Sequence, residues 1–225
     1  MEPVWDGITR PKTLGDEALR VRQEVADAGK NYDRPRVLAI LAENQEFINS
    51  TRLGGRSLYA PLHQAAHGGA APDIVHPLID LGAWRTLQNA RGERPIDVAE
   101  RCGHRLLLGI LSPELKRRVP IGILLKVQAQ FHAVIRGRAG REVQEYGLRL
   151  PELEPLLEFE DVPGMYGGFH YWLAVDGVEA KLVSESWCRV VQGSGQRHEV
   201  TSAESKLVEE GFGAASRMSP GLHAR

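Results

Sequence analysis

The chain has 225 residues and a mass of 24.9 kDa, which is enough for one or two domains of ordinary size. Hydrophobic residues make up 42% of it and charged residues 25%, so the composition excludes a chain that is disordered throughout. Its formal net charge of −1 at pH 7 argues against a protein that coats nucleic acid, and we do not expect nucleic acid as a partner.

The sequence predicts neither a membrane anchor nor a metal site. Its longest apolar runs, 106–111 and 121–125, are far shorter than the ~18–20 residues of a membrane-spanning helix. Residues 1–6 lack the basic-then-apolar order of a signal peptide, so we expect a cytoplasmic protein. Cys102 and Cys188 are too few for a disulfide scaffold or a thiolate zinc site, and we expect no metal and no cofactor.

The N-terminal half contains an internal repeat with an offset of 34 residues. Residues of the same kind recur at this offset: Pro61 and Pro95, Leu62 and Ile96, Ala65 and Ala99, Gly69 and Gly103. Proline suits the first turn of a helix, and glycine suits the left-handed backbone that ends one. The pattern therefore predicts helix pairs that stack on each other through small apolar side chains.

The segment Pro61–Ala66, with the sequence Pro-Leu-His-Gln-Ala-Ala, resembles the signature of the ankyrin repeat, whose period is near 33 residues. A more degenerate copy precedes it, with helical composition at Glu17–Ala28 and Arg36–Leu41. The resemblance implies an α-solenoid of about three ankyrin repeats over residues 14–112. It also implies that His63 bonds loop backbone and ties neighbouring repeats together, so we predict no catalytic residue there.

The sequence of the C-terminal half predicts a small α+β domain over residues 113–212, followed by a disordered tail over 213–225. Apolar residues recur at helical spacing in Ile121–Arg136, and helical composition resumes at Arg141–Tyr146. An antiparallel meander is expected next. Its predicted strands are Phe169–Val175, Val178–Ser184, Trp187–Val191, Arg197–Thr201 and Leu207–Val208, with turns at Pro163-Gly164 and Asp176-Gly177.

This second half is similar to a module of uncharacterised bacterial proteins, some of which carry ankyrin repeats in front of it. The resemblance runs through Met165–Phe169 and Glu185–His198. It implies no activity.

The leading functional hypothesis is a non-enzymatic protein-interaction module that binds an unknown partner on the concave surface of the repeats. Such surfaces are built from loop tips and first helices. By the repeat frame, the predicted partner contacts are Arg56, Tyr59, Gln64, His67, Asn89, Arg91, Glu93 and Arg94. Trp84 is either an exposed anchor for the partner or a residue packed beneath a loop.

The alternative hypothesis is that the C-terminal domain is an enzyme or a receptor for a small anion, with the repeats as its targeting arm. The turn Gly193-Ser194-Gly195 is flanked by cations that would bind such an anion if they converged. The predicted ligand contacts are Tyr166, Trp187, Arg189, Arg197 and His198. The competing interpretation is a tight hairpin whose arginines pair with Glu185 and Glu199. An immunity-like or regulatory protein is a third possibility.

Overall fold

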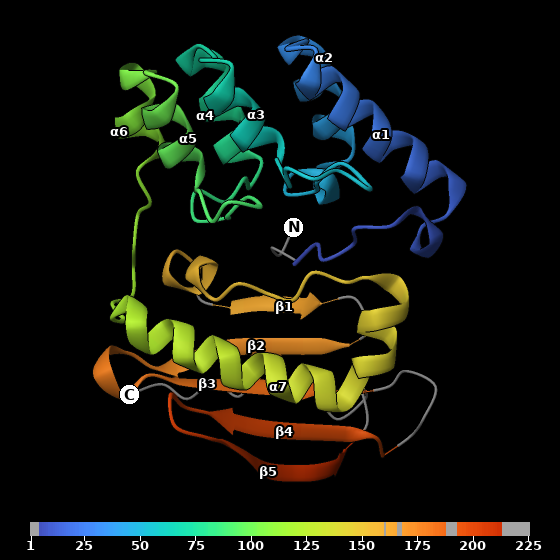
Figure 1. The fold of residues 1–225 in the computed structure, drawn as a ribbon, viewed down its shortest axis with the longest axis vertical. Helices are drawn as coiled ribbons and strands as arrows, with labels where there is room; N and C mark the ends of the chain where they lie inside the picture. Colours follow the sequence, from blue (N-terminus) through green and yellow to red (C-terminus); the bar gives the residue numbers. More distant parts are fainter. Residues whose placement is uncertain (1–4, 160, 166–167, 188–192, 213–225) are drawn as a thin grey trace.

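The computed structural model describes residues 5–159, 161–165, 168–187 and 193–212. Within them, a set of short helices is followed by one long helix and a small antiparallel sheet, as the sequence predicts (Figure 1). None of the described helices combines the length and the apolar character that a membrane span requires.

The first six helices form three consecutive pairs. The bounds are α1 Asp16–Lys30 and α2 Arg34–Glu43, α3 Pro61–His67 and α4 Pro72–Asp80, and α5 Pro95–Arg101 and α6 Leu108–Leu111. The first helices contact one another in the order α1, α3, α5, and the second helices in the order α2, α4, α6. The pairs are therefore stacked side by side, as Figure 1 shows.

The recurring prolines and glycines have the same local role in the second and third pairs. Pro61 and Pro95 each occupy the first turn of a helix, where a missing N–H costs nothing. Gly69 and Gly103 follow these helices with φ of 57° and 79°, a backbone conformation that other residues adopt only with strain. The predicted helix starts and helix ends are confirmed at these positions.

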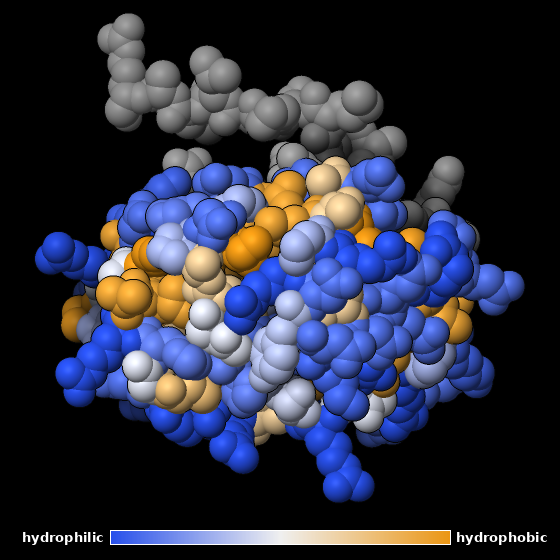
Figure 2. Space-filling model, turned by 90° about the horizontal axis from the view of Figure 1, so that it is seen from above, coloured by the Kyte–Doolittle hydropathy of each residue, from blue (hydrophilic) through white to orange (hydrophobic). Residues whose placement is uncertain are grey.

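The helix array differs in polarity between its two ends. An ion-pair network of Glu17, Arg20, Glu24 and Arg36 covers α1 and α2. Seen from above (Figure 2), this side is hydrophilic, whereas hydrophobic residues gather toward the side of α4–α6. There Leu106, just before α6, is 88% exposed. The first pair thus has the water-facing outer surface that suits the end of a stack.

The second half consists of α7, Ile121–Tyr146, and a five-stranded sheet in the order β1-β2-β3-β4-β5, with every neighbour antiparallel. The strands are β1 Asp161–Met165, β2 Phe169–Val175, β3 Lys181–Ser186, β4 Gly195–Val200 and β5 Ser205–Phe212. α7 lies across one face of this meander (Figure 1). It joins the two predicted helical stretches through one residue with non-helical backbone angles, Ala139.

Two predicted turns of the meander are wrong. Pro163 and Gly164 lie inside β1, an edge strand, where a residue without an N–H is tolerated. Asp176 and Gly177 do not form a two-residue hairpin. A 3-10 turn at Gly177–Glu179 replaces it, with the Gly177 N–H bonded to the carbonyl of Arg118 at 2.9 Å. Val178, in this turn, is 71% exposed.

The remaining strand predictions have mixed outcomes. β4 and β5 include the predicted segments Arg197–Thr201 and Leu207–Val208 in large part, and β5 is longer than expected. Trp187 follows the end of β3, so no described residue of the predicted strand Trp187–Val191 is in a strand. The rest of that strand and the predicted tail 213–225 lie outside the described residues.

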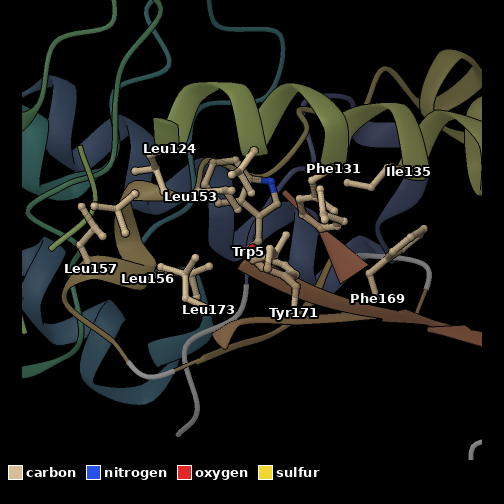
Figure 3. Close-up of a cluster of buried hydrophobic side chains, with 14 of the residues drawn as sticks. Trp5, Leu124, Phe131, Ile135, Leu153, Leu156, Leu157, Phe169, Tyr171 and Leu173 are labelled. Atoms are coloured by element: carbon tan, nitrogen blue, oxygen red, sulfur yellow. The ribbon is translucent and has the colours of Figure 1, made fainter. Parts of the chain in front are cut away.

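The core of the second half reaches into the first half. It combines α7, the sheet and the 3-10 turn Glu154–Leu157 with Trp5, as Figure 3 shows. Trp84 and Leu87 belong to the same core. The rings of Trp5 and Trp84 stack with centroids 5.9 Å apart. Trp84 is only 1% exposed, so of its two predicted roles the exposed anchor is wrong, and the residue packs in this core.

Replacing Trp84 by alanine should destabilise the whole chain. A buried tryptophan leaves a large cavity when it is truncated, and we expect Trp84→Ala to lower the free energy of unfolding by about 3–5 kcal/mol. Urea unfolding followed by circular dichroism measures this change. Leu106→Ala is the control, because removing an exposed apolar side chain should cost less than about 0.5 kcal/mol. Equal effects of the two substitutions would contradict the assignment of Trp84 to the core.

Candidate functional site

A groove of about 460 Å³ lies between the first two helix pairs on the side of α1 and α3. We call it the α1–α3 groove. It is lined by Val25, Ala26, Gly29 and Lys30 of α1, by Ser50, Arg52, Gly55, Arg56, Ser57 and Tyr59 of the loop before α3, and by Tyr32, Pro61, Gln64 and His67. The groove brings together four predicted partner contacts: Arg56, Tyr59, Gln64 and His67.

One wall of the groove is aromatic and held in place by hydrogen bonds. The hydroxyl of Tyr32 and Nδ1 of His67 share a hydrogen bond of 2.8 Å, and their rings are nearly parallel. Tyr59 meets the ring of His67 edge-on at 5.8 Å. Its hydroxyl accepts a hydrogen bond of 3.0 Å from Arg101. These contacts fix the three rings before any ligand arrives.

The backbone is strained on both sides of the groove. Among the described residues, Tyr32 and Leu58 are the non-glycine residues with positive φ, at 56° and 52°. Tyr32 lines the groove, and Leu58 stands between two lining residues, Ser57 and Tyr59. Such strain costs about 1–3 kcal/mol per residue and tends to gather at functional sites.

The close approach of Tyr32 to α3 depends on a glycine. A Cβ at position 68 would lie 2.3 Å from the Tyr32 ring, so only glycine leaves room for the ring at that position. The ring is 45% exposed and faces the groove from the turn after α1. Sequence reasoning missed Tyr32, because it takes the left-handed position that Gly69 and Gly103 take after α3 and α5, and no glycine marks it. It also missed Lys30 and Arg52, which belong to no recurring motif.

The basic side chains of the groove are unevenly paired. Arg52 forms an ion pair with Asp27, which does not line the groove. Lys30 and Arg56 form no ion pair with any of the residues that the structure describes. No lining residue is acidic. The groove therefore has a positive rim.

The other predicted partner contacts lie elsewhere and serve the protein itself. Asn89 is buried, and its Oδ1 accepts the N–H groups of Arg91 and Glu93 at 2.7 and 3.1 Å. Hydrogen bonds from Arg101 and Asn89 lower the pKa of Glu93 to about 2. Asn89 and Glu93 thus hold their own loop together, while the Arg91 side chain is exposed.

Arg94 joins the two halves of the molecule. Its guanidinium makes two hydrogen bonds of 2.8 Å to the carboxylate of Glu154, which is 3% exposed and belongs to the second half. Further contacts support this junction. Thr86 donates to Glu158 at 3.0 Å, and the backbone N–H of Gln88 donates to Glu152 at 2.9 Å. The loop before α5 therefore contacts the second half of the protein itself.

The predicted ligand contacts do not converge. Arg197 and His198 are consecutive in β4, so their side chains point to opposite faces of the sheet. Arg197 pairs with Glu185 at 2.7 Å, as the competing hairpin interpretation expects, but its second partner is Glu209, whereas Glu199 pairs with Lys181. Trp187 is half-buried after β3. Tyr166 and Arg189 lie outside the described residues.

Nδ1 of the partly buried His198 belongs to a row of buried polar atoms on the sheet. Tyr171, Ser184 and His198 are direct neighbours across β2, β3 and β4. The Tyr171 hydroxyl, the Ser184 hydroxyl and Nδ1 of His198 have no hydrogen-bond partner among the described residues. Burial lowers the pKa of His198 and raises that of Tyr171.

The described residues contain no cluster of three or more His, Cys, Asp or Glu side chains that could hold a metal ion.

His63 has the structural role that the sequence predicts. It is fully buried, its Nδ1 accepts the N–H of Ala60 at 3.4 Å, and its Nε2 lies 3.2 Å from the carbonyl oxygen of Glu93. With Nδ1 accepting, Nε2 carries the proton and donates it to Glu93. Burial lowers the pKa of His63 to about 4, because the charged ring would lose its water.

A comparison with protein families found no family model that matches the chain, and a comparison with curated proteins found no match.

Loss of Arg94 should destabilise the chain, because the carboxylate of Glu154 would stay buried without its partner. We expect Arg94→Ala to lower the free energy of unfolding by about 3 kcal/mol, at the low end for broken buried pairs. Arg36→Ala is the matched control, since its pair with Glu24 is exposed and should contribute at most about 1 kcal/mol. Urea unfolding of both variants checks this. Similar losses would contradict a structural role for the Arg94–Glu154 pair.

The free energy of unfolding should decrease as the pH is lowered, and part of this decrease should depend on His63. The folded pKa of about 4 lies below the ordinary value of about 6.5, so protons bind the unfolded chain first as pH falls. His63 then removes about 3 kcal/mol of stability between pH 6.5 and 4. Burial lowers the pKa of His132 as well, so the measurement must compare variants.

The comparison uses urea unfolding across this pH range. His63→Gln should show a smaller loss of stability than the wild-type chain, by about 3 kcal/mol. His76→Gln, on the exposed surface of α4, should follow the wild type. Parallel pH curves for the wild type and His63→Gln would contradict the assignment.

Proposed function

We propose that the protein is a non-enzymatic interaction module that binds a protein partner in the α1–α3 groove. The observation that carries the proposal is the aromatic wall of Tyr32, Tyr59 and His67. Its rings are fixed by hydrogen bonds and ring contacts, and strained backbone lies on both sides of the groove. A wall that is ordered in advance lowers the entropic cost of binding. Its rings also provide the aromatic surface that interaction sites favour.

The proposal includes an assignment of the three helix pairs as ankyrin repeats. Three features support it: prolines at the starts of α3 and α5, glycines with positive φ after them, and the buried His63 between α3 and the next loop. In a stack of this kind, the first helices and the preceding loops make the binding surface. The α1–α3 groove is formed by these parts.

Only part of this surface is free in the proposed function. The loop before α5 holds the second half through Arg94, and Asn89 and Glu93 hold that loop. We therefore assign partner binding to Arg56, Tyr59, Gln64 and His67, which line the groove; Arg91 is exposed but does not line it. A cytoplasmic location agrees with this assignment and stays a prediction.

A second candidate function is a receptor for a small polar ligand in the C-terminal half. It is favoured by the row of Tyr171, Ser184 and His198, because buried polar groups usually have a partner. The separation of Arg197 from His198 counts against an anion held by both. We rank this function second because the α1–α3 groove is an open cavity with an ordered aromatic wall.

Site-specific photo-crosslinking in the native cell tests the interaction module. A photo-reactive amino acid at Ser57, an exposed lining residue, should give a discrete adduct with a protein partner. The same group at Asp73, an exposed residue of α4 outside the groove, should not. Adducts that are identical at both positions, or found only at Asp73, would refute binding in the groove.

A further inference from the structure

We infer that the α1–α3 groove binds an acidic, extended segment of a protein partner, with a carboxylate at the positive rim and an apolar or aromatic side chain against the aromatic wall. This inference rests on the proposed function and specifies the chemistry of the partner. It follows from the charge of the rim, the exposure of the wall and the size of the groove.

Two of the three cations at the rim, Lys30 and Arg56, have no counter-charge within the described part of the chain. Lys30, Arg52 and Arg56 line the groove, and no Asp or Glu does. Arg56 is exposed and forms no ion pair within the described part of the chain, so its guanidinium is available to a carboxylate. Arginine binds carboxylates through two parallel hydrogen bonds, which gives orientation as well as attraction. The rim thus selects negative charge.

The wall offers a complementary apolar surface a short distance away. Tyr32 is 45% exposed although its backbone is strained, and its orientation is fixed by His67. An aromatic or aliphatic side chain packed on Tyr32 and Tyr59 would cover this surface. The volume of about 460 Å³ lies within the range of ordinary binding sites, about 300–1,000 Å³, and suits a few residues of extended chain.

Single-stranded nucleic acid shares part of this chemistry, since it also combines negative charge with stacking bases. The groove favours a peptide, because nucleic-acid channels carry a continuous basic track along the backbone. Here Arg52 is already paired with Asp27, which leaves two unpaired cations among the lining residues. The chain as a whole has a net charge of −1.

The test selects random peptides displayed on phage against the full chain and then measures each selected peptide by fluorescence anisotropy. Three variants are compared. Arg56→Glu reverses the charge at the rim. Arg105→Glu makes the same change at an exposed arginine outside the groove. Ser57→Trp fills the groove whatever the charge of its occupant. Circular dichroism confirms that each variant is folded, and a labelled thymidine oligonucleotide is measured in parallel.

The expected peptides are rich in Asp and Glu and contain an aromatic or aliphatic residue. Arg56→Glu and Ser57→Trp should weaken their binding about tenfold or more, whereas Arg105→Glu should leave it unchanged. Higher salt should weaken it as well, because the contacts are exposed.

The other outcomes separate this inference from the proposed function. Neutral or basic peptides that are lost with Ser57→Trp would overturn the acidic partner and keep the groove as a protein-binding site. If no selected peptide is affected by Ser57→Trp, both the inference and the proposed function fail. If the oligonucleotide binds more tightly than every peptide and is lost with Arg56→Glu, the occupant is nucleic acid and the inference is wrong.

Discussion

The packing of Trp84 against Trp5 is the contact on which the rest of this structure depends. Trp84 comes from a loop of the helix array and Trp5 from the N-terminal segment, yet both lie in the core of the α7–sheet half. Burying two tryptophan side chains at this junction favours the arrangement of the two halves in which both are shielded from water. Hydrophobic contacts do not fix an orientation, but the two hydrogen bonds of the Arg94–Glu154 pair fix how the loop before α5 is oriented against the second half.

This arrangement divides the loops of the array between two tasks. The loop before α5 faces the second half and is held there by buried and paired side chains. The loop before α3 has one free side, where it meets α1 and forms the groove with its aromatic wall. The second half therefore acts as a support that fixes the loops, and the open groove is the part of the array that remains for a partner in the proposed function.

Local signals were enough to predict the helix pairs, the role of His63 and most of the meander. Proline and glycine at Pro61, Pro95, Gly69 and Gly103 act through the backbone of their own segment, so the sequence alone reveals them. Contacts between distant segments were not predictable in this way. Three features depend on tertiary packing: the Arg94–Glu154 pair, the hydrogen bond from Gly177 to the carbonyl of Arg118, and the burial of Trp84. Tyr32 was missed because it stands where Gly69 and Gly103 end α3 and α5, and a tyrosine there gives no local signal.

The left-handed backbone of Tyr32 has a consequence for how this sequence balances competing demands. Glycine is the usual residue at the end of a helix in this conformation, and it would remove the strain. The chain keeps a large ring there, seated over Gly68 and bonded to His67, at a cost in folding free energy. Substitution of Tyr32 by glycine would therefore stabilise the backbone and remove the wall of the groove, so that at position 32 stability and the proposed recognition make opposite demands.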